Sequence, residues 1–347
     1  FKKCILPSSL KIPSKCRIIY LSETPPVKII NPSIIRTYKF TKYEPFDIFE
    51  IPENVISTII TKTSFKKLSG KSNKIIIIDC KKLNHNFKIP SGTNYFEASK
   101  TNIKNIIGSA SCINLSECKK LSSEFTIPFR CKYINLSKTP IIKLFGTAET
   151  IDLSHCKLIP DIFYIPKKCK NLNLSYTHIK GVIGNVKYLN VSHCPHLLST
   201  FSVPETCKKL KICFTNITKL YAPNTISIDI SGCDFLDKTF KIPKSCKTLD
   251  ISCTPISKLI PNKKIEQLNL TRCKNLKKNF KIPKGCELIN LSYTDIKKIS
   301  GTAKIINLYK CQNLHSPFKI PKGCQIINLK FTNKIKILNA KNSVIIS

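Results

Sequence analysis

The chain of 347 residues repeats itself every 38 to 40 residues, and each period contains two different units. The longer unit, A, begins at Ile113 with an Ile-Asn-Leu-Ser segment and continues through a cysteine and a Phe-Thr-Ile-Pro segment to Cys131. The shorter unit, B, runs from Cys131 to Leu144 and carries its own Ile-Asn-Leu-Ser segment. Because a fixed period of this length lets neighbouring units bury one another's apolar edges, it predicts a solenoid in which the repetition is itself the fold.

The apolar residues that open successive Ile-x-Leu segments set the register of the repeat. They are Ile113, Ile134, Ile151, Leu172, Leu189, Leu210, Ile228, Leu249, Leu268, Ile289, Ile306 and Ile327. Their separations alternate between 21 residues and 17 to 19 residues, so A is the longer coil and B is a minimal one. The alternation points two side chains inward and the intervening one outward, which predicts a short strand in every coil. Upstream, Thr58 and Ile60 continue the B series, and we expect residues 34–46, the poorest match, to distort one coil.

The residues of the two units resemble a known repeat family. Unit B, with Cys131, Leu136 and Thr139, resembles the leucine-rich repeat L-x-x-L-x-L-x-x-N-x-L, with cysteine as the first leucine and threonine as the asparagine. Unit A, with Cys118 in the asparagine position, resembles the cysteine-containing repeats found beside F-boxes. Residues 166–177 resemble the short repeats of bacterial effectors, and the Phe-x-Ile-Pro element is similar to FNIP-type and BspA-like repeats of protists, giant viruses and bacteria.

That resemblance covers roughly the whole chain and implies an α/β-type repeat solenoid with little helix. It implies a leucine-rich-repeat arc of about 18 short strands, with a parallel β-sheet on the concave face and a length of about 85 Å at the usual strand spacing. The proline of each Phe-x-Ile-Pro element disfavours helix at the residue before it, so we expect an extended turn to close each A coil. Neither end carries the polar cap that a solenoid needs, and we therefore interpret residues 1–347 as a single solenoid truncated at both ends within a longer protein.

The charge of the chain is extreme: 58 Lys and Arg residues against 20 Asp and Glu give a net charge of +38. Such an excess indicates an anionic partner, such as nucleic acid, an anionic lipid or an acidic protein surface. A drift in composition would give the same excess, because lysine is over-used together with isoleucine and asparagine. The lysines gather on connecting segments that would face solvent, as at Lys277, Lys281 and Lys284. Both explanations stay open.

The 18 cysteines would indicate a disulfide scaffold in a short secreted chain. In this repeat, however, equivalent A-unit cysteines such as Cys118 and Cys156 lie two coils apart, about 9 to 10 Å. A disulfide needs Cα atoms within about 7 Å. The pattern therefore predicts reduced core thiols and a cytoplasmic, reducing compartment, which would be the cytosol of a host cell if the protein is an effector.

An outward-facing polar residue separates the two apolar residues of each segment. These residues are Asn114, Asn135, Asp152, Asn173, Asn190, Asp229, Asp250, Asn269, Asn290, Asn307 and Asn328. Because stacked amides can hydrogen-bond along a parallel array, we expect this row to be primarily structural.

The position after the following serine varies from coil to coil, which makes it the best candidate for partner recognition. Aromatic and basic side chains alternate there at intervals of about 5 Å. The candidate partner-binding residues are Tyr176, His193, Phe214, Arg272, Tyr293 and Lys310. Aromatic residues and cations together suit anchoring of a protein partner or contacts with nucleic acid. A surface position that tolerates any residue would vary in the same way.

The sequence offers no constellation typical of an enzyme. The His-Cys dipeptides at 155–156 and 193–194 place each cysteine inward and each histidine outward in the repeat. The spacing of zinc ligands is absent, as are a carboxylate pair and a glycine-rich phosphate loop. We therefore expect no enzymatic activity, no cofactor and no metal site. No apolar stretch reaches the length of about 18 residues that a membrane span needs.

These observations predict a protein–protein interaction module that binds its partner on the concave face. The family resemblance implies the recognition part of an effector or of a ubiquitin-ligase adaptor. The alternative function is a binder of nucleic acid or another anionic surface through the basic face. Salt dependence separates the two, because binding to phosphates weakens steeply as salt rises.

Overall fold

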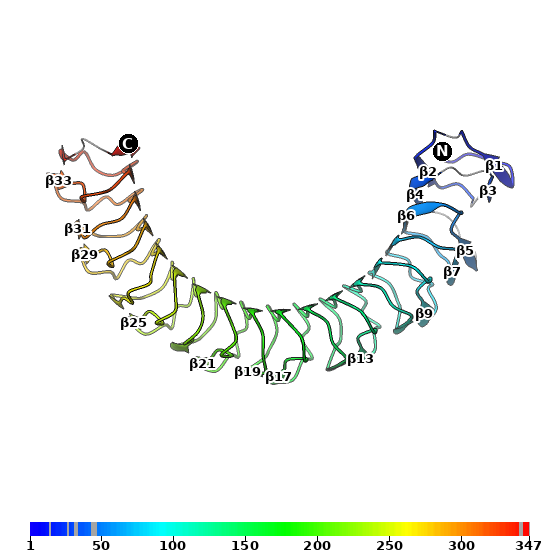
Figure 1. Cartoon of the computed structure of the whole chain (residues 1–347), viewed down its shortest axis with the longest axis horizontal. Helices are drawn as coiled ribbons and strands as arrows, with labels where there is room; N and C mark the ends of the chain where they lie inside the picture. The colour runs from blue at the N-terminus through cyan, green and yellow to red at the C-terminus, as the bar shows by residue number, and fades with distance from the viewer. Residues whose placement is uncertain (14, 26–27, 31–33, 43–46, 340–342, 347) are drawn as a thin grey trace. The chain divides into compact units, whose positions relative to one another are not determined.

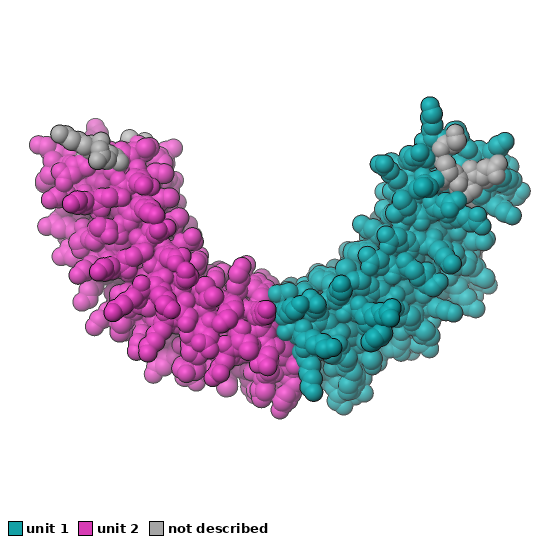
Figure 2. Space-filling view, in the orientation of Figure 1, with its two compact units in different colours: residues 1–160, 166–174 teal, residues 161–165, 175–347 magenta. Residues whose placement is uncertain are grey.

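The computed structural model describes residues 1–13, 15–25, 28–30, 34–42, 47–339 and 343–346. The chain divides into two compact units, residues 1–160 with 166–174 and residues 161–165 with 175–347 (Figure 2). Every regular element in the described residues is a β-strand. The predicted α/β type is not confirmed, because the described residues contain no helix. The chain is a parallel β-solenoid, and within each unit its coils stack along one long sheet (Figure 1).

In the first unit, nine parallel strands form this long sheet, which we call the main sheet. The strands are β2 (Ile18–Ser22), β4 (Ile35–Thr41), β6 (Val55–Thr61), β8 (Lys74–Ile78), β10 (Tyr95–Ser99), β12 (Cys112–Asn114), β14 (Tyr133–Asn135), β16 (Thr150–Asp152) and β18 (Asn171–Asn173). Their register follows the predicted spacing, since Ile134 pairs with Ile113 on one side and with Ile151 on the other. Ile113 and Leu115 are completely buried, as Ile-x-Leu alternation requires.

A second strand, of two or three residues, crosses the rear of each coil, and in the described residues it pairs within an A–B couple. In the first unit the pairs are β1 (Ser9–Lys11) with β3 (Lys28–Ile30), β5 (Ile48–Glu50) with β7 (Lys67–Ser69), β9 (Asn86–Lys88) with β11 (Asn105–Ile107), and β13 (Glu124–Thr126) with β15 (Lys143–Phe145). Phe125 of the Phe-x-Ile-Pro element lies in β13 and pairs with Leu144. The element is therefore extended, as predicted, but it forms a rear strand that the sequence analysis did not predict.

The second unit repeats the same plan with nine further main-sheet strands. They are β20 (Tyr188–Asn190), β22 (Lys209–Lys211), β24 (Ser227–Asp229), β26 (Thr248–Asp250), β28 (Gln267–Asn269), β30 (Leu288–Asn290), β32 (Ile305–Asn307), β34 (Ile326–Asn328) and β36 (Val344–Ile346). Its rear pairs are β17 (Ile162–Tyr164) with β19 (Gly181–Ile183), β21 (Thr200–Ser202) with β23 (Lys219–Tyr221), β25 (Thr239–Lys241) with β27 (Lys258–Ile260), β29 (Asn279–Lys281) with β31 (Lys298–Ser300), and β33 (Phe318–Lys319) with β35 (Ile337–Leu338). The main-sheet strands of the two units add up to the predicted number of about 18.

The expected distortion at residues 34–46 is wrong for residues 34–42. Residues 35–41 form β4, one of the longest strands, and its Phe40 pairs with Leu21 and Ile60 in regular register. Tyr38 and Phe40 are buried in the positions that aliphatic residues hold in other coils, and these aromatic rings concealed the pattern. Residues 43–46 lie outside the described residues.

Six threonine–cysteine pairs line the core beyond the main-sheet strands, each linking one coil to the next. The Cys118 thiol donates to the carbonyl oxygen of Ala98 at 2.9 Å and lies 3.3 Å from the Thr101 hydroxyl. Equivalent pairs are Thr139–Cys156, Thr177–Cys194, Thr215–Cys233, Thr254–Cys273 and Thr294–Cys311. These cysteines therefore donate hydrogen bonds to buried backbone carbonyl groups. They stand in the asparagine position of the repeat pattern, and the hydrogen bonds explain why a polar side chain is suited to that position.

All 18 cysteines lie in the described residues; none forms a disulfide, and only Cys253 is exposed. We expect the protein, unfolded without reductant, to titrate close to 18 free thiols with a thiol-specific reagent. In the folded protein, Cys253 should react first, because burial keeps the core thiols protonated and out of reach. Recovery of mostly disulfide-linked peptides would contradict both the register and the proposed reducing compartment.

Candidate functional site

Each main-sheet strand from β2 to β34 is followed by a residue in the left-handed region of the backbone, and these residues form what we call the turn row. Its members are Glu23, Lys42, Lys62, Asp79, Lys100, Glu117, Lys138, His155, Tyr176, His193, Phe214, Gly232, Cys253, Arg272, Tyr293, Lys310 and Phe331. Their φ angles lie between 52° at Lys62 and 66° at Gly232. The variable position of the sequence analysis is therefore a left-handed turn. Sequence reasoning missed this conformation because only Gly232 marks it.

Hydrogen bonds on both sides of the turn fix its conformation. The outward Asn135 side chain accepts a hydrogen bond from the backbone amide of Ser137 at 2.9 Å, and most of its equivalents do the same. The next amide, that of Lys138, donates to the carbonyl oxygen of Ser154 in the following coil at 2.9 Å. The expected ladder of side-chain hydrogen bonds along this row forms only in part. Side chains of neighbouring coils bond at Asn173–Asp152 and at Asn269–Asp250, whereas most side chains of the row bond to the backbone of their own turn.

The residue types in the turn row are not those that the backbone prefers. Glycine and asparagine occupy the left-handed region most easily, whereas a bulky L-residue there costs on the order of 1 kcal/mol or more. In the second unit the row instead holds tyrosine, histidine, phenylalanine and arginine. Backbone preference does not explain these side chains, which points to a role for what they present at the surface.

Three of the predicted site residues form one stack of rings in the second unit. The ring centroids of Tyr176 and His193 are 4.3 Å apart with an interplanar angle of 7°. Those of His193 and Phe214 are 4.8 Å apart at 13°. The separations match the spacing of strands in a sheet, so the coil repeat itself holds the rings in register. Tyr176 is 44% exposed and Phe214 56%, which leaves the ring edges open to a partner.

Gly232 ends this stack. A Cβ atom built on Gly232 would clash with Cε1 of Phe214, so the Phe214 ring occupies the space of the missing side chain. Two features therefore favour glycine at position 232: its φ of 66° lies in the left-handed region, and the Phe214 ring leaves no room for a Cβ atom.

We expect Gly232→Ala to displace the Phe214 ring and to destabilise the protein by about 1 kcal/mol, since alanine is also strained at positive φ. The ring-current shifts of the His193 protons in NMR spectra would report the loss of stacking. Cys253→Ala is the matched control, because Cys253 occupies the next row position with a φ of 54° and already carries a Cβ. Unchanged His193 shifts in Gly232→Ala would contradict the assigned ring position.

The other three predicted residues form a second cluster in the same unit, built from cations over rings. The Arg272 guanidinium lies 5.0 Å from the Tyr293 ring centroid, and Lys310 Nζ lies 5.3 Å from the same centroid. Lys310 Nζ also lies 5.6 Å from the ring of Tyr309 and 5.8 Å from that of Phe331. Three rings thus surround one ammonium group, an arrangement in which cation–π attraction restrains the lysine.

Tyr309 was not among the predicted site residues. It stacks edge to face with Tyr293 at 5.5 Å and with Phe331 at 5.4 Å, and so joins the two rings. A sequence clue was available, because Tyr309 stands where Ser116, Ser137 and most other coils have serine. Two row positions, Gly232 and Cys253, separate this cluster from the ring stack.

Among the described residues, the cations of the second cluster have no acidic partner. No carboxylate of the described residues lies within 4.0 Å of Arg272, Lys310 or Lys330, the last of which lies over the Phe331 ring. Elsewhere in the same unit, Lys247 and Lys304 each form an ion pair of 2.7 Å with a glutamate of a neighbouring coil. The cluster therefore presents positive charge that remains available to a ligand.

Within the described ranges of the chain, no three His, Cys, Asp or Glu side chains gather closely enough to hold a metal ion. No helix in the described part of the chain is long and apolar enough to cross a membrane.

The in-register parallel sheet, with one Ile-x-Leu strand per coil, defines a leucine-rich-repeat-like fold. No family model matches the chain, and no curated protein sequence matches it. Among solved structures, the chain is similar to YopM from Yersinia enterocolitica WA-314, with 10% sequence identity and a TM-score of 0.46 over 95% of this chain and 84% of that chain.

Proposed function

We propose that this protein is a protein-binding scaffold and that the turn row of its second unit is the binding surface. The observation that carries the proposal is the stack of Tyr176, His193 and Phe214, whose rings are held in order by the coil spacing before any partner binds. Exposed aromatic side chains supply large contact area, and prior ordering reduces the entropy lost on binding.

The second cluster supports a partner with acidic groups. Arg272, Lys310 and Lys330 are positioned over rings, and no carboxylate of the residues that the structure describes lies within 4.0 Å of them. An acidic side chain of the partner would form ion pairs with these cations. Cations that are fixed beside aromatic anchors favour a specific contact over diffuse electrostatic attraction. We therefore propose a partner that offers an acidic, partly apolar surface to this row.

Binding of nucleic acid through the same row has weaker support. A base inserted between two rings needs them about 7 Å apart, twice the stacking distance of about 3.4 Å. The rings of the stack are 4.3 and 4.8 Å apart and therefore leave no room for a base between them. The net charge of +38 still favours binding of nucleic acid or another anionic surface at a different part of the chain. That charge is the observation on which this alternative function rests.

The proposal extends to the setting of the protein. Buried thiols support a reducing, cytoplasmic compartment. A role as the recognition part of an effector or of a ubiquitin-ligase adaptor, without enzymatic activity of its own, rests on the resemblance of the repeats.

Two triple variants test which side of the coils binds the partner that affinity capture identifies. We expect Tyr176→Ala with Phe214→Ala and Tyr293→Ala to lower affinity at least about thirtyfold through faster dissociation, because these rings are the proposed anchors. The control, Lys277→Glu with Lys281→Glu and Lys284→Glu, changes exposed lysines around rear strand β29 and should alter mainly the salt-dependent association rate.

Circular dichroism would verify that both triple variants remain folded. If the lysine variant alone abolishes binding and the aromatic variant binds normally, the recognition surface lies on the rear side and the anionic-partner alternative replaces this proposal.

A further inference from the structure

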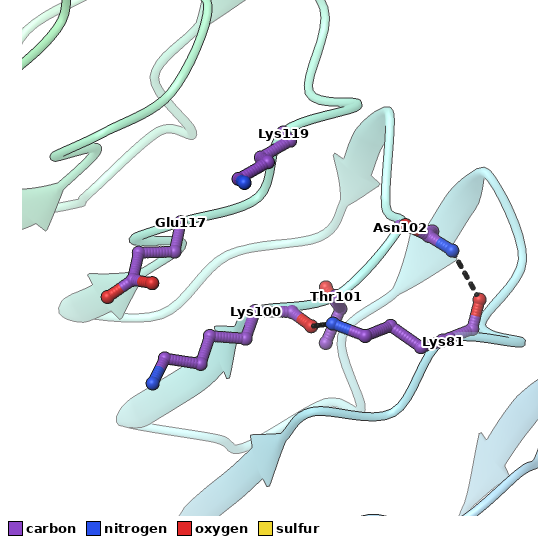
Figure 3. A pocket seen from close by; sticks show the side chains of 6 residues that line it. All are labelled: Lys81, Lys100, Thr101, Asn102, Glu117 and Lys119. Atoms are coloured by element: carbon purple, nitrogen blue, oxygen red, sulfur yellow. Dashed lines mark hydrogen bonds between the residues drawn. The ribbon is translucent and has the colours of Figure 1, made fainter.

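The turn row of the first unit carries mainly lysines and carboxylates rather than rings, and a lysine-lined pocket of about 260 Å³ opens beside it (Figure 3). The lining residues are Lys81, Lys100, Thr101, Asn102, Glu117 and Lys119. Hydrogen bonds hold one wall in place: Lys81 Nζ donates to the carbonyl oxygen of Lys100 at 2.6 Å, and the Asn102 amide donates to that of Lys81 at 2.9 Å. The pocket therefore has a defined shape within a lysine-rich surface.

The repeat builds this pocket a second time, 38 residues later. The second pocket is lined by the cationic or titratable residues Lys119, Lys138, His155 and Lys157, together with the apolar residues Pro140 and Leu158. Lys119 and Lys157 hold the positions that Lys81 and Lys119 hold in the first pocket, and Lys138 holds that of Lys100. Because two coils separate equivalent residues, the pockets lie about 10 Å apart. Lys119 lines both.

Two carboxylates lie near these lysines, and both are already paired. Asp79 forms an ion pair with Lys81 at 2.8 Å, and Glu117 forms one with Lys138 at 3.3 Å. Lys100, Lys119 and Lys157 have no carboxylate within 4.0 Å among the described residues. The two pockets together therefore carry at least three uncompensated positive charges at fixed repeat positions.

We propose that these tandem pockets bind one multi-phosphate anion, with Lys119 placed between its phosphate groups. Lysine ammonium groups are compact point charges that bind phosphate from several directions, which suits open pockets. A single phosphate would bind weakly at such exposed groups, whereas an anion that reaches both pockets gains from effective concentration. The site lies in the first unit and is separate from the proposed protein-binding row of the second.

Titration with linear polyphosphate of about ten phosphates at 0.15 M salt tests the site, with inorganic monophosphate as the short-ligand comparison. We expect Lys119→Gln to weaken polyphosphate binding about tenfold, because both pockets lose a cation. The matched control is Lys274→Gln, which removes the same charge at the equivalent repeat position of the second unit and should change the affinity less than about twofold. Equal losses in the two variants would overturn the proposal, since binding would then depend on net charge alone.

Glu117→Gln provides a change of opposite sign. It removes the carboxylate that lines the first pocket and releases Lys138, so polyphosphate should bind about threefold more tightly. Glu266→Gln is its control, because Glu266 pairs with Lys247 at 2.7 Å in the second unit. If Glu117→Gln and Glu266→Gln raise the affinity for polyphosphate equally, binding depends on net charge alone and the proposed pockets are wrong.

Vesicles distinguish a lipid headgroup from a soluble polyphosphate as the source of the phosphates. Phosphatidylcholine vesicles with and without a phosphoinositide bisphosphate serve as probes for the wild type, Lys119→Gln and Lys274→Gln. Vesicle binding that depends on Lys119 assigns the pockets to a headgroup, and Lys119-dependent binding of polyphosphate alone assigns them to a soluble anion. The triple variant at Tyr176, Phe214 and Tyr293 should bind polyphosphate normally, so failure here is distinguishable from failure of the protein-binding proposal.

Discussion

Raising the pH from 8 to 11 should unfold this protein over a narrow range. Burial raises the pKa of Cys131, Cys169 and Cys246 to about 12, and that of Cys207 and Cys286 to about 11, from a usual value of 9.0. In the unfolded chain these thiols lose their protons near pH 9, whereas in the folded chain they keep them. Folding is therefore favoured fully below pH 9, and this stability is lost as the pH rises through 9 toward 12.

The expected size of this effect is large because the thiols repeat. Each thiol that is protonated only in the folded state removes about 1.4 kcal/mol of stability per pH unit within that window. Five such thiols remove about 7 kcal/mol per unit, comparable to the whole free energy of unfolding of a typical domain, about 5 to 15 kcal/mol. Loss of lysine charge in the same range acts in the opposite direction by relieving the repulsion of a +38 chain. That relief is smaller, since exposed charges are screened by water and salt.

Urea midpoints at pH 7.5, 9, 10 and 11 in the presence of a reductant would measure the loss. Cys131→Ala is the informative variant: it removes one raised pKa, so its stability should fall less steeply with pH, by about 1.4 kcal/mol per unit. A wild-type midpoint that stays constant up to pH 11 would contradict the burial of these thiols.

The core could be predicted from the sequence because its spacing is rigid. Ile113, Leu115 and Cys118 recur at fixed offsets, and any other register would place them in water. The rear strands were less visible, because a segment such as Phe125-Thr-Ile127 has only two apolar residues and its partner lies in the next coil. Tyr38 and Phe40 were missed because aromatic residues replaced the aliphatic ones.

The residues of the candidate site could be predicted from the sequence, but the way in which their side chains pack together could not. Tyr176, His193 and Phe214 are predicted from the sequence to be exposed and neighbouring, and the structure brings their rings together. That the rings stack on one another depends on the left-handed turns and on Gly232, which a pattern of residue types does not reveal. Tyr309 joins the second cluster by substituting for serine, so a search for aromatic residues at the variable position alone does not find it.

Leu174→Ala should be strongly destabilising, whereas Tyr176→Ala, two residues later, should be mild. The Leu174 side chain is completely buried and Tyr176 is 44% exposed. Removal of the buried leucine methyl groups leaves a cavity and should lower the free energy of unfolding by about 2 to 5 kcal/mol. Tyr176→Ala loses one ring contact with His193 and should lower it by about 1 kcal/mol at most.

Urea denaturation of the two single variants would measure this contrast, and a second pair provides an independent repetition. Leu136 is completely buried and Lys138 is exposed at the equivalent positions two coils earlier, so their alanine variants should differ in the same way. Each coil is stabilised by its neighbours, so a buried substitution should lower the stability of the adjacent coils as well as that of its own. Similar losses for the buried and exposed members of both pairs would mean that the faces of the strands are assigned wrongly, and the turn row could then not be the binding surface.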